Sequence, residues 1–177
     1  IPGVYANGDY DVAGFCVGIV ERAKLIDGSR VRAGDAIVGL ASSGVHANGF
    51  SLVRRVLSKA DLSRYHRRLL VPTRIYVKPI LRLVSQIPLH AVVHVTGGGL
   101  SRRLPSLAAT HPRLRVRLVP ESRPAPAIFQ VIQRAGRISD EEMMGTFNMG
   151  IGMALACRAR DAGRILCVMA RAGIPAW

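Results

Sequence analysis

The hydrophobic periodicity of this 177-residue chain changes repeatedly between that of a β-strand and that of an α-helix. Short apolar and β-branched stretches indicate strands, whose alternate side chains point to opposite faces. Apolar residues that recur every three or four positions indicate helices with one buried face. An alternation of the two patterns predicts an α/β (α+β) sandwich, in which a mixed β-sheet packs against helices.

The individual elements follow from these patterns and from the glycines and prolines between them. The expected strands are Asp11–Val20, Lys24–Ile26, Ala36–Ala41, Ala91–Val95, Leu114–Val119 and Phe147–Ala156. The expected helices are one beginning near Asn48, then Tyr76–Ile87, Ala127–Ala135, Asp140–Gly145 and Asp161–Ala172. Three residues mark positions within them: Pro79 in a first turn, Gly136 at a C′ position and Asp161 as an N-cap.

Composition excludes several classes of protein. Hydrophobic residues make up 49% of the chain, which rules out a disordered segment. No apolar run approaches the roughly 18–20 residues that cross a bilayer, and residues 1–3 do not resemble a leader peptide. The three cysteines are odd in number and do not have metal-site spacing. We therefore expect buried, reduced thiols, no metal site and a cytoplasmic protein.

The net charge of +14 and the isoelectric point near 11.3 are typical of nucleic-acid binders. However, only three of the 25 basic residues are lysine, a bias that codon usage in a GC-rich genome can produce. Aromatic residues are 5% of the chain and do not interleave with the arginines, so no stacking platform is expected. We therefore do not expect dedicated nucleic-acid binding.

The first candidate motif is the segment Ser42–Gly49, which joins a predicted strand to a predicted helix. Ser43, His46 and Asn48 would present polar groups at the carboxyl end of that strand, where ligands bind in many α/β sheets. The alternative is purely structural, with Asn48 or Ser51 capping the helix and His46 idle in a turn.

The second motif is a run of three glycines after the strand that contains His94. The backbone amides of glycines at the start of a helix are not shielded by side chains, so they can bind an anion such as phosphate. This function would fall to Thr96, Gly97, Gly98 and Gly99. The alternative is that the glycines allow the loop to pack tightly against a neighbouring strand.

The third motif is Asn148, Gly150 and Gly152, which alternate along the predicted strand and would share one face. Such a face is flat and open, so either another backbone or a ligand covers it. The preceding pair Glu141 and Glu142 diverges by about 100° in a helix and cannot serve one site.

Read together, these motifs resemble the C-terminal domain of the phosphoribosylformylglycinamidine cyclo-ligase (aminoimidazole ribonucleotide synthetase) family. The match runs in order along nearly the whole chain. The blocks that carry it are Asp9–Gly18, Ser42–Arg54, Pro72–Pro79, His94–Leu100 and Met144–Gly152. The chain departs from the family pattern at Ser101–Ser106, which puts the contacts after the glycines in doubt.

The resemblance implies an ATP-dependent ligase that converts formylglycinamidine ribonucleotide to aminoimidazole ribonucleotide in purine biosynthesis. It implies a homodimer, with ATP and Mg²⁺ held mainly by an N-terminal domain that this chain lacks. Residues 1–177 would then be one C-terminal-type domain, truncated at both ends and inactive alone. Ser43, His46, Asn48 and the Thr96–Gly99 loop would line the substrate groove, and Asn148 and Gly150 would face it. The alternatives are a phosphate- or nucleotide-binding module without turnover and an Arg-rich nucleic-acid-binding derivative.

Overall fold

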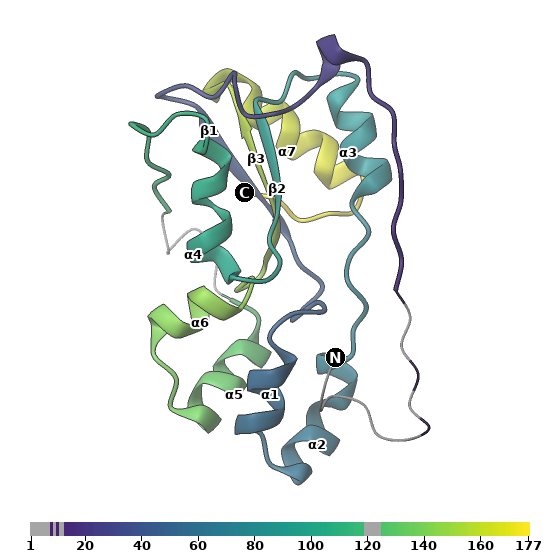
Figure 1. Ribbon diagram of the computed structural model, residues 1–177, viewed down its shortest axis with the longest axis vertical. Helices are drawn as coiled ribbons and strands as arrows, with labels where there is room; N and C mark the ends of the chain where they lie inside the picture. The colour runs from purple at the N-terminus through teal and green to yellow at the C-terminus, as the bar shows by residue number, and fades with distance from the viewer. Residues whose placement is uncertain (1–7, 9, 11–12, 119–124) are drawn as a thin grey trace.

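A computed structural model describes residues 8, 10, 13–118 and 125–177 of the chain (Figure 1). Its sheet has three strands, β1 (Ala36–Ala41), β2 (Ala91–His94) and β3 (Ile151–Cys157), in the order β1-β3-β2. Both pairings are antiparallel, so the described sheet is antiparallel and the expected mixed sheet is corrected. The cause is topological: β1 and β2 run in the same direction, but β3 inserts between them. The α+β class is confirmed.

The free edge of β1 pairs with the last residues of the chain. Ala176 forms an antiparallel bridge with Leu40, and the Gly39 amide donates to the Trp177 carbonyl at 3.0 Å. The Trp177 amide returns a hydrogen bond to the Gly39 carbonyl at 3.2 Å. The residues that follow the last helix therefore extend the sheet at this edge.

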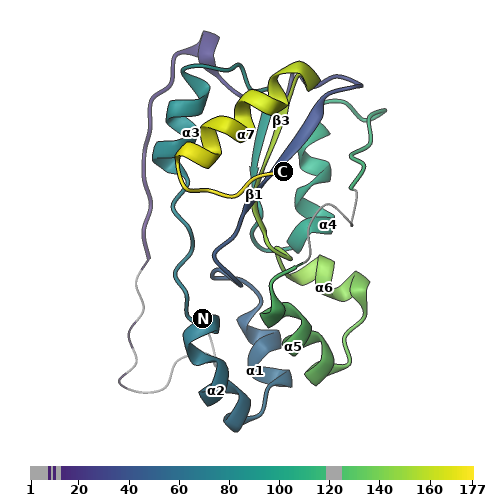
Figure 2. The same cartoon turned by 180° about the vertical axis from the view of Figure 1, so that it is seen from behind.

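The described residues form seven α-helices, which lie in two groups (Figures 1 and 2). Helices α3 (Val77–Val84) and α7 (Ala162–Arg171) cover one sheet face, and α4 (Gly99–Arg103) lies against the other. The remaining helices form a helical lobe beyond one end of the sheet. They are α1 (Phe50–Val56), α2 (Lys59–Leu69), α5 (Ala127–Gly136) and α6 (Asp140–Thr146). Short 3₁₀ turns occupy Arg22–Lys24, Pro105–Ala108 and Ala159–Asp161.

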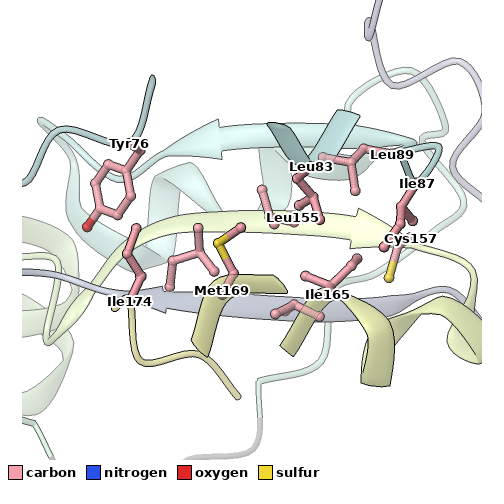
Figure 3. Close-up of a cluster of buried hydrophobic side chains, with 11 residues drawn as sticks. Tyr76, Leu83, Ile87, Leu89, Leu155, Cys157, Ile165, Met169 and Ile174 are labelled. Atoms are coloured by element: carbon pink, nitrogen blue, oxygen red, sulfur yellow. The ribbon is translucent and has the colours of Figure 1, made fainter. Parts of the chain in front are cut away.

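Each layer has its own apolar core. Leu83, Leu155 and Met169 fill the space between the sheet and helices α3 and α7 (Figure 3). Phe129 and Phe147 are fully buried at the centre of the helical lobe, with ring centroids 5.8 Å apart. Burying such side chains is the main force that holds the two layers and the lobe together. Among the described residues, no helix is both long and apolar enough to cross a membrane.

Several expected strands are not strands. Residues 13–20 have no strand pairing, and Phe15, Val17 and Ile19 are almost fully exposed; residues 11 and 12 lie outside the described residues. The expected strand Lys24–Ile26 is the end of a 3₁₀ turn followed by unpaired chain. Both segments lack strand structure for the same reason. A strand-like sequence forms a strand only where a neighbouring strand pairs with its backbone hydrogen-bonding groups.

The other strand corrections concern the second half of the chain. Residues 114–118 run without strand pairing, and Val119 lies outside the described residues. The expected strand Phe147–Ala156 begins only at Ile151, because a turn precedes it.

Helix ends also differ in detail. The first helical stretch breaks after Val56, and Ser58 caps a second helix by accepting from the Asp61 amide at 3.1 Å. Helix α5 ends at Gly136, and its C-cap residue Arg137, not Gly136, takes the left-handed conformation (φ 49°). Asp161 precedes α7 but makes no capping bond.

Of the remaining expectations about the fold, one is confirmed and one is wrong. Pro79 lies in the first turn of α3, as expected. Of the three free cysteines only Cys157 is buried, whereas Cys16 and Cys167 are exposed, which corrects the expectation of three buried thiols.

Candidate functional site

The three sequence motifs meet at the end of the sheet that faces the helical lobe. The Ser42 amide donates to the Gly150 carbonyl at 2.8 Å, which joins the first motif to the third. The Val95 amide donates to the Gly152 carbonyl at 2.9 Å, which joins the second motif to the third. Antiparallel pairing brings this about, because the ends of β1 and β2 both lie beside the start of β3.

Asn148 holds two of these loops together. Its side-chain amide donates to the carbonyls of Gly44 (2.9 Å) and Val45 (3.1 Å), and its Oδ1 accepts from the Gly150 amide (2.8 Å). The side chain is 3% exposed, so its polar atoms serve the protein. Asn148 and Gly150 lie in a turn before β3, and the expectation that they share a strand face with Gly152 is wrong.

Gly150 and Gly152 are small for different reasons. Gly150 has φ 97°, and a Cβ there would lie 2.7 Å from the Pro126 ring. A Cβ on Gly152 would overlap the Tyr76 hydroxyl and lie 2.7 Å from Cε1 of His46. The open face predicted at Gly152 is therefore filled by two side chains.

His46 is buried, 3% exposed, and adopts a left-handed backbone conformation with φ 61°. Its Nε2 accepts a hydrogen bond from the Ser43 amide at 3.1 Å. Burial first, and then the nearby His94 and Arg74, lower the pKa of His46 to about 4. The ring is thus neutral at pH 7, and because Nε2 is an acceptor its proton lies on Nδ1. His46 is not idle in a turn.

Three aromatic rings cluster around Gly152. The ring of His46 lies 6.3 Å from that of Tyr76 and 6.1 Å from that of His94, and the latter two are 6.0 Å apart. The Tyr76 hydroxyl donates to the Ala41 carbonyl at 2.7 Å, and burial raises its pKa to about 12. Figure 3 shows the Tyr76 side chain at the end of the apolar core.

The three glycines have different surroundings. A Cβ on Gly99 (φ 58°) would overlap the Met144 carbonyl and lie 2.8 Å from that of Phe147, so α4 packs closely on the end of α6. Gly98 has φ 91°, and Gly97 has room for a side chain. The Gly99 amide donates a hydrogen bond to the Thr96 carbonyl at 3.0 Å. The packing interpretation therefore holds for Gly99.

Other polar groups at the site remain available. Within the described part of the chain, the amides of Gly97 and Gly98 have no hydrogen-bond acceptor. The Asn48 Oδ1 lies 3.8 Å from where a Gly97 Cβ would be, and the Asn48 side chain makes no hydrogen bond among the same residues. Gly49 is the N-cap of α1, with φ 82°, so the alternative of an Asn48 or Ser51 cap is wrong.

Ser43 connects the first motif to a segment that sequence reasoning used only for the resemblance. Its hydroxyl donates to the Pro72 carbonyl at 2.7 Å. Arg74 and Tyr76 follow in that segment and contribute to the site. The signal was present, since Pro72–Pro79 was one of the family blocks, but spacing alone does not assign a role to either side chain.

A hollow of about 520 Å³ opens beside this cluster. Its polar end is formed by Thr73, Arg74, Tyr76 and His94, and its remainder is apolar. The apolar lining consists of Ile75, Val77, Ile80, Leu81 and Met153. A hollow of this size with a few converging polar groups is typical of small-molecule sites.

The site does not fit Mg²⁺. This ion prefers carboxylate and water oxygens. In the described ranges, no three His, Cys, Asp or Glu residues come together, and the hollow is lined by Arg74 and by no carboxylate among these residues. We therefore assign no metal ligand to the described residues and derive no step through Mg²⁺.

Comparison with known proteins identifies a matching family and several curated relatives. The family described as "AIR synthase related protein, C-terminal domain" matches residues 32–177. The chain is 46% identical over 187 residues to the phosphoribosylformylglycinamidine cyclo-ligase of Coxiella burnetii and 45% identical over 188 residues to that of Nitrosococcus oceani. For the Burkholderia mallei protein of the same name the identity is 46% over 185 residues. These alignments cover 100% of this chain and 51–52% of each relative, so the chain spans about half the length of the curated relatives it matches.

Proposed function

This chain belongs to the AIR synthase related protein, C-terminal domain family, and from that premise we propose that it forms the C-terminal half of an ATP-dependent cyclo-ligase. The reaction would convert formylglycinamidine ribonucleotide to aminoimidazole ribonucleotide and form a C–N bond. The observation that carries the proposal is similarity at about 46% identity along the whole chain to proteins of that name. The meeting of the three family motifs at one end of the sheet supports it.

In this proposal the chain contributes binding groups for a phosphorylated substrate. The Asn48 side chain and the amides of Gly97 and Gly98 are among the polar groups of the site that have no hydrogen-bond partner in the described protein. Such groups position a reactant, and positioning accounts for much of the catalysis in phosphoryl transfer. ATP and Mg²⁺ would be held mainly by the N-terminal half, and Asn148 and Gly150 would shape the groove from below.

The N-terminal half would also cover an exposed part of this chain. Phe15, Val17 and Ile19 are 97%, 89% and 101% exposed, and they alternate as the residues of a strand do. They precede residue 32, where the family match begins. We infer that this segment completes a sheet of the preceding domain, so that the C-terminal-type domain proper starts near residue 32. A homodimer formed through the N-terminal domain and a cytoplasmic location complete the proposal.

Reconstitution tests this function. The chain is mixed with a separately produced N-terminal half, and ADP release is measured with and without formylglycinamidine ribonucleotide. We expect substrate-dependent release only from the mixture, and a loss of at least about tenfold with Asn48→Ala, which removes a substrate hydrogen bond. Ser85→Ala, on the exposed end of α3, serves as the control. A stable complex without turnover would contradict the ligase proposal and favour a binding module.

A further inference from the structure

Two buried donors at the site have no acceptor. Among the described residues, Nδ1 of His46 and Nε of Arg74 are the buried side-chain atoms without a hydrogen-bond partner. An unpaired buried donor is destabilising and is rare in folded proteins. Two of them in one cluster call for a shared explanation, and a ligand that supplies an acceptor provides it.

The protonation of His46 makes its Nδ1 a donor. The Ser43 amide already donates to Nε2, at 3.1 Å, and an N–H donor requires a lone pair on that nitrogen. In the neutral ring the proton is therefore on Nδ1, with its N–H pointing at no protein acceptor. The left-handed backbone at His46 (φ 61°) keeps the ring in this place at a cost in strain.

The electrostatic surroundings favour an anion. The charged neighbours that act on the pKa of His46 are His94 and Arg74, and the one that acts on His94 is Arg103. All three are cationic when charged, and each lowers the pKa of the histidine that it faces. Burial is the larger cause of the lowered pKa of both histidines, so the preference for an anion rests on the permanently charged Arg74 and Arg103, whose positive potential stabilises a negatively charged group.

The hollow gives such a group a place. Arg74, Tyr76 and His94 form its polar end. The His46 ring does not line the hollow itself but lies 6.3 Å from the Tyr76 ring and 6.1 Å from the His94 ring. His94 is the exposed residue of the three, and contact of a ligand with the buried Nδ1 of His46 requires the His94 ring to move aside. The apolar remainder of the hollow suits the uncharged part of a phosphorylated ligand.

We propose that the polar end of this hollow is an oxyanion subsite, in which His46 Nδ1–H and the Arg74 guanidinium bind the phosphate group of a phosphorylated ligand. Arginine and imidazole N–H groups form charge-assisted hydrogen bonds with phosphate oxygens. The inference rests on the proposed function in that the ribonucleotide substrate of that reaction carries such a group. It assigns the phosphate to Arg74 and His46, away from the glycine loop.

Titration of the 177-residue chain tests the subsite without the N-terminal half. Ribose 5-phosphate, inorganic phosphate, ATP and unphosphorylated ribose are added in turn, with affinity measured by calorimetry and the His46 ring nitrogens followed by NMR. We expect the phosphorylated probes to bind and to shift the Nδ1–H signal of His46, and ribose to do neither. Tighter binding of ribose 5-phosphate than of ATP would assign the subsite to the sugar phosphate, and the reverse order would assign it to the nucleotide.

Variants separate the two donors from a general loss of charge. Arg74→Met and His46→Gln should each weaken ribose 5-phosphate binding at least about tenfold, since each removes a hydrogen bond to a charged group. His46→Asn, which keeps a donor near the Nδ1 position and tolerates a positive φ, should weaken it less. The control Arg82→Met removes an exposed arginine from α3 and should change affinity less than about twofold.

Circular dichroism and thermal unfolding confirm that each variant is folded. An unchanged His46 signal in the folded wild-type chain would overturn the proposal, as would equal effects of Arg74→Met and Arg82→Met. The outcome does not depend on turnover. Phosphate binding without ADP release in the reconstituted mixture would contradict the ligase function and leave the subsite supported. ADP release without phosphate binding to this chain would support the ligase function and contradict the subsite.

Discussion

Gly99 shows how a single residue couples the glycine loop to the helical lobe. A methyl group there would overlap the Met144 carbonyl, and φ is 58°. Gly99→Ala should therefore lower the free energy of unfolding by roughly 2–4 kcal/mol, through backbone strain and overpacking. Chemical denaturation of the chain measures this value.

Gly97→Ala is the matched control, because a Cβ at Gly97 meets nothing closer than Asn48 Oδ1 at 3.8 Å. We expect it to change stability by less than about 0.5 kcal/mol. Equal destabilisation by the two substitutions would show that α4 does not pack on α6 as described.

The buried, neutral state of His46 makes stability depend on pH. Its pKa is lowered from 6.5 to about 4, so between these values the unfolded chain binds more protons than the folded one. Stability therefore falls as the pH drops through this window, by roughly 2–3 kcal/mol from this residue. His94, whose pKa is lowered by burial and by Arg103, acts in the same direction.

Denaturation midpoints between pH 4 and 7.5 measure the effect, and His46→Asn should flatten the dependence. An equally steep dependence in that variant would contradict the role given to His46.

Sequence reasoning found the loops of the site but did not assign roles within them. The SSGVHANG turn and the glycines were identified because small and polar residues after a strand are unusual. The structural role of Asn148 was not predictable, because its partners Gly44 and Val45 are more than a hundred positions away. Arg74 and Tyr76 were missed for a related reason: a side chain becomes part of a site only when the fold brings its neighbours to it.

At the scale of the elements, helices were predicted better than strands. Helix α3 follows from its own apolar face and from Pro79, both of which are local features. A strand depends on a partner, and the pattern of residues 114–118 does not reveal that none accepts it in the described structure. The antiparallel order was equally hidden, because only the placement of β3 between β1 and β2 decides it.

The break between α1 and α2 was also missed, and it depends on a single cap. The Ser58 hydroxyl accepts from the Asp61 amide at 3.1 Å and donates to the Asp61 carboxylate at 2.6 Å. Ser58→Ala should lower the free energy of unfolding by about 1 kcal/mol, the usual loss when an N-cap is removed.

The comparison is Ser85→Ala, whose exposed hydroxyl bonds only to the Arg82 carbonyl one turn earlier. It should cost less than about 0.5 kcal/mol. If thermal unfolding of the two variants coincides, the Ser58 cap does not stabilise α2.

At the scale of the molecule, the sheet with its two helical faces and the helical lobe meet at the candidate site (Figure 2). Polar groups of the site come from loops between these parts, while Phe129, Leu155 and their neighbours hold the parts in place. Of the basic residues behind the net charge of +14, Arg74 and Arg103 act on His46 and His94 at this site. The wider role of this charge was not predictable from the sequence.

The exposed apolar segment provides the prediction that concerns the whole protein. Phe15 is 97% exposed, so Phe15→Ser should leave the thermal midpoint of this chain unchanged. In the presence of the N-terminal half the same change should weaken association at least about tenfold, because burying a phenylalanine contributes roughly 1.5–3 kcal/mol. Hydrogen exchange should also show protection of residues 13–20 only in the mixture. Leu70→Ser, at a 68% exposed position after α2, should not weaken association. Equal effects of the two substitutions would show that the segment is not the contact surface, and that the other half binds elsewhere on this domain.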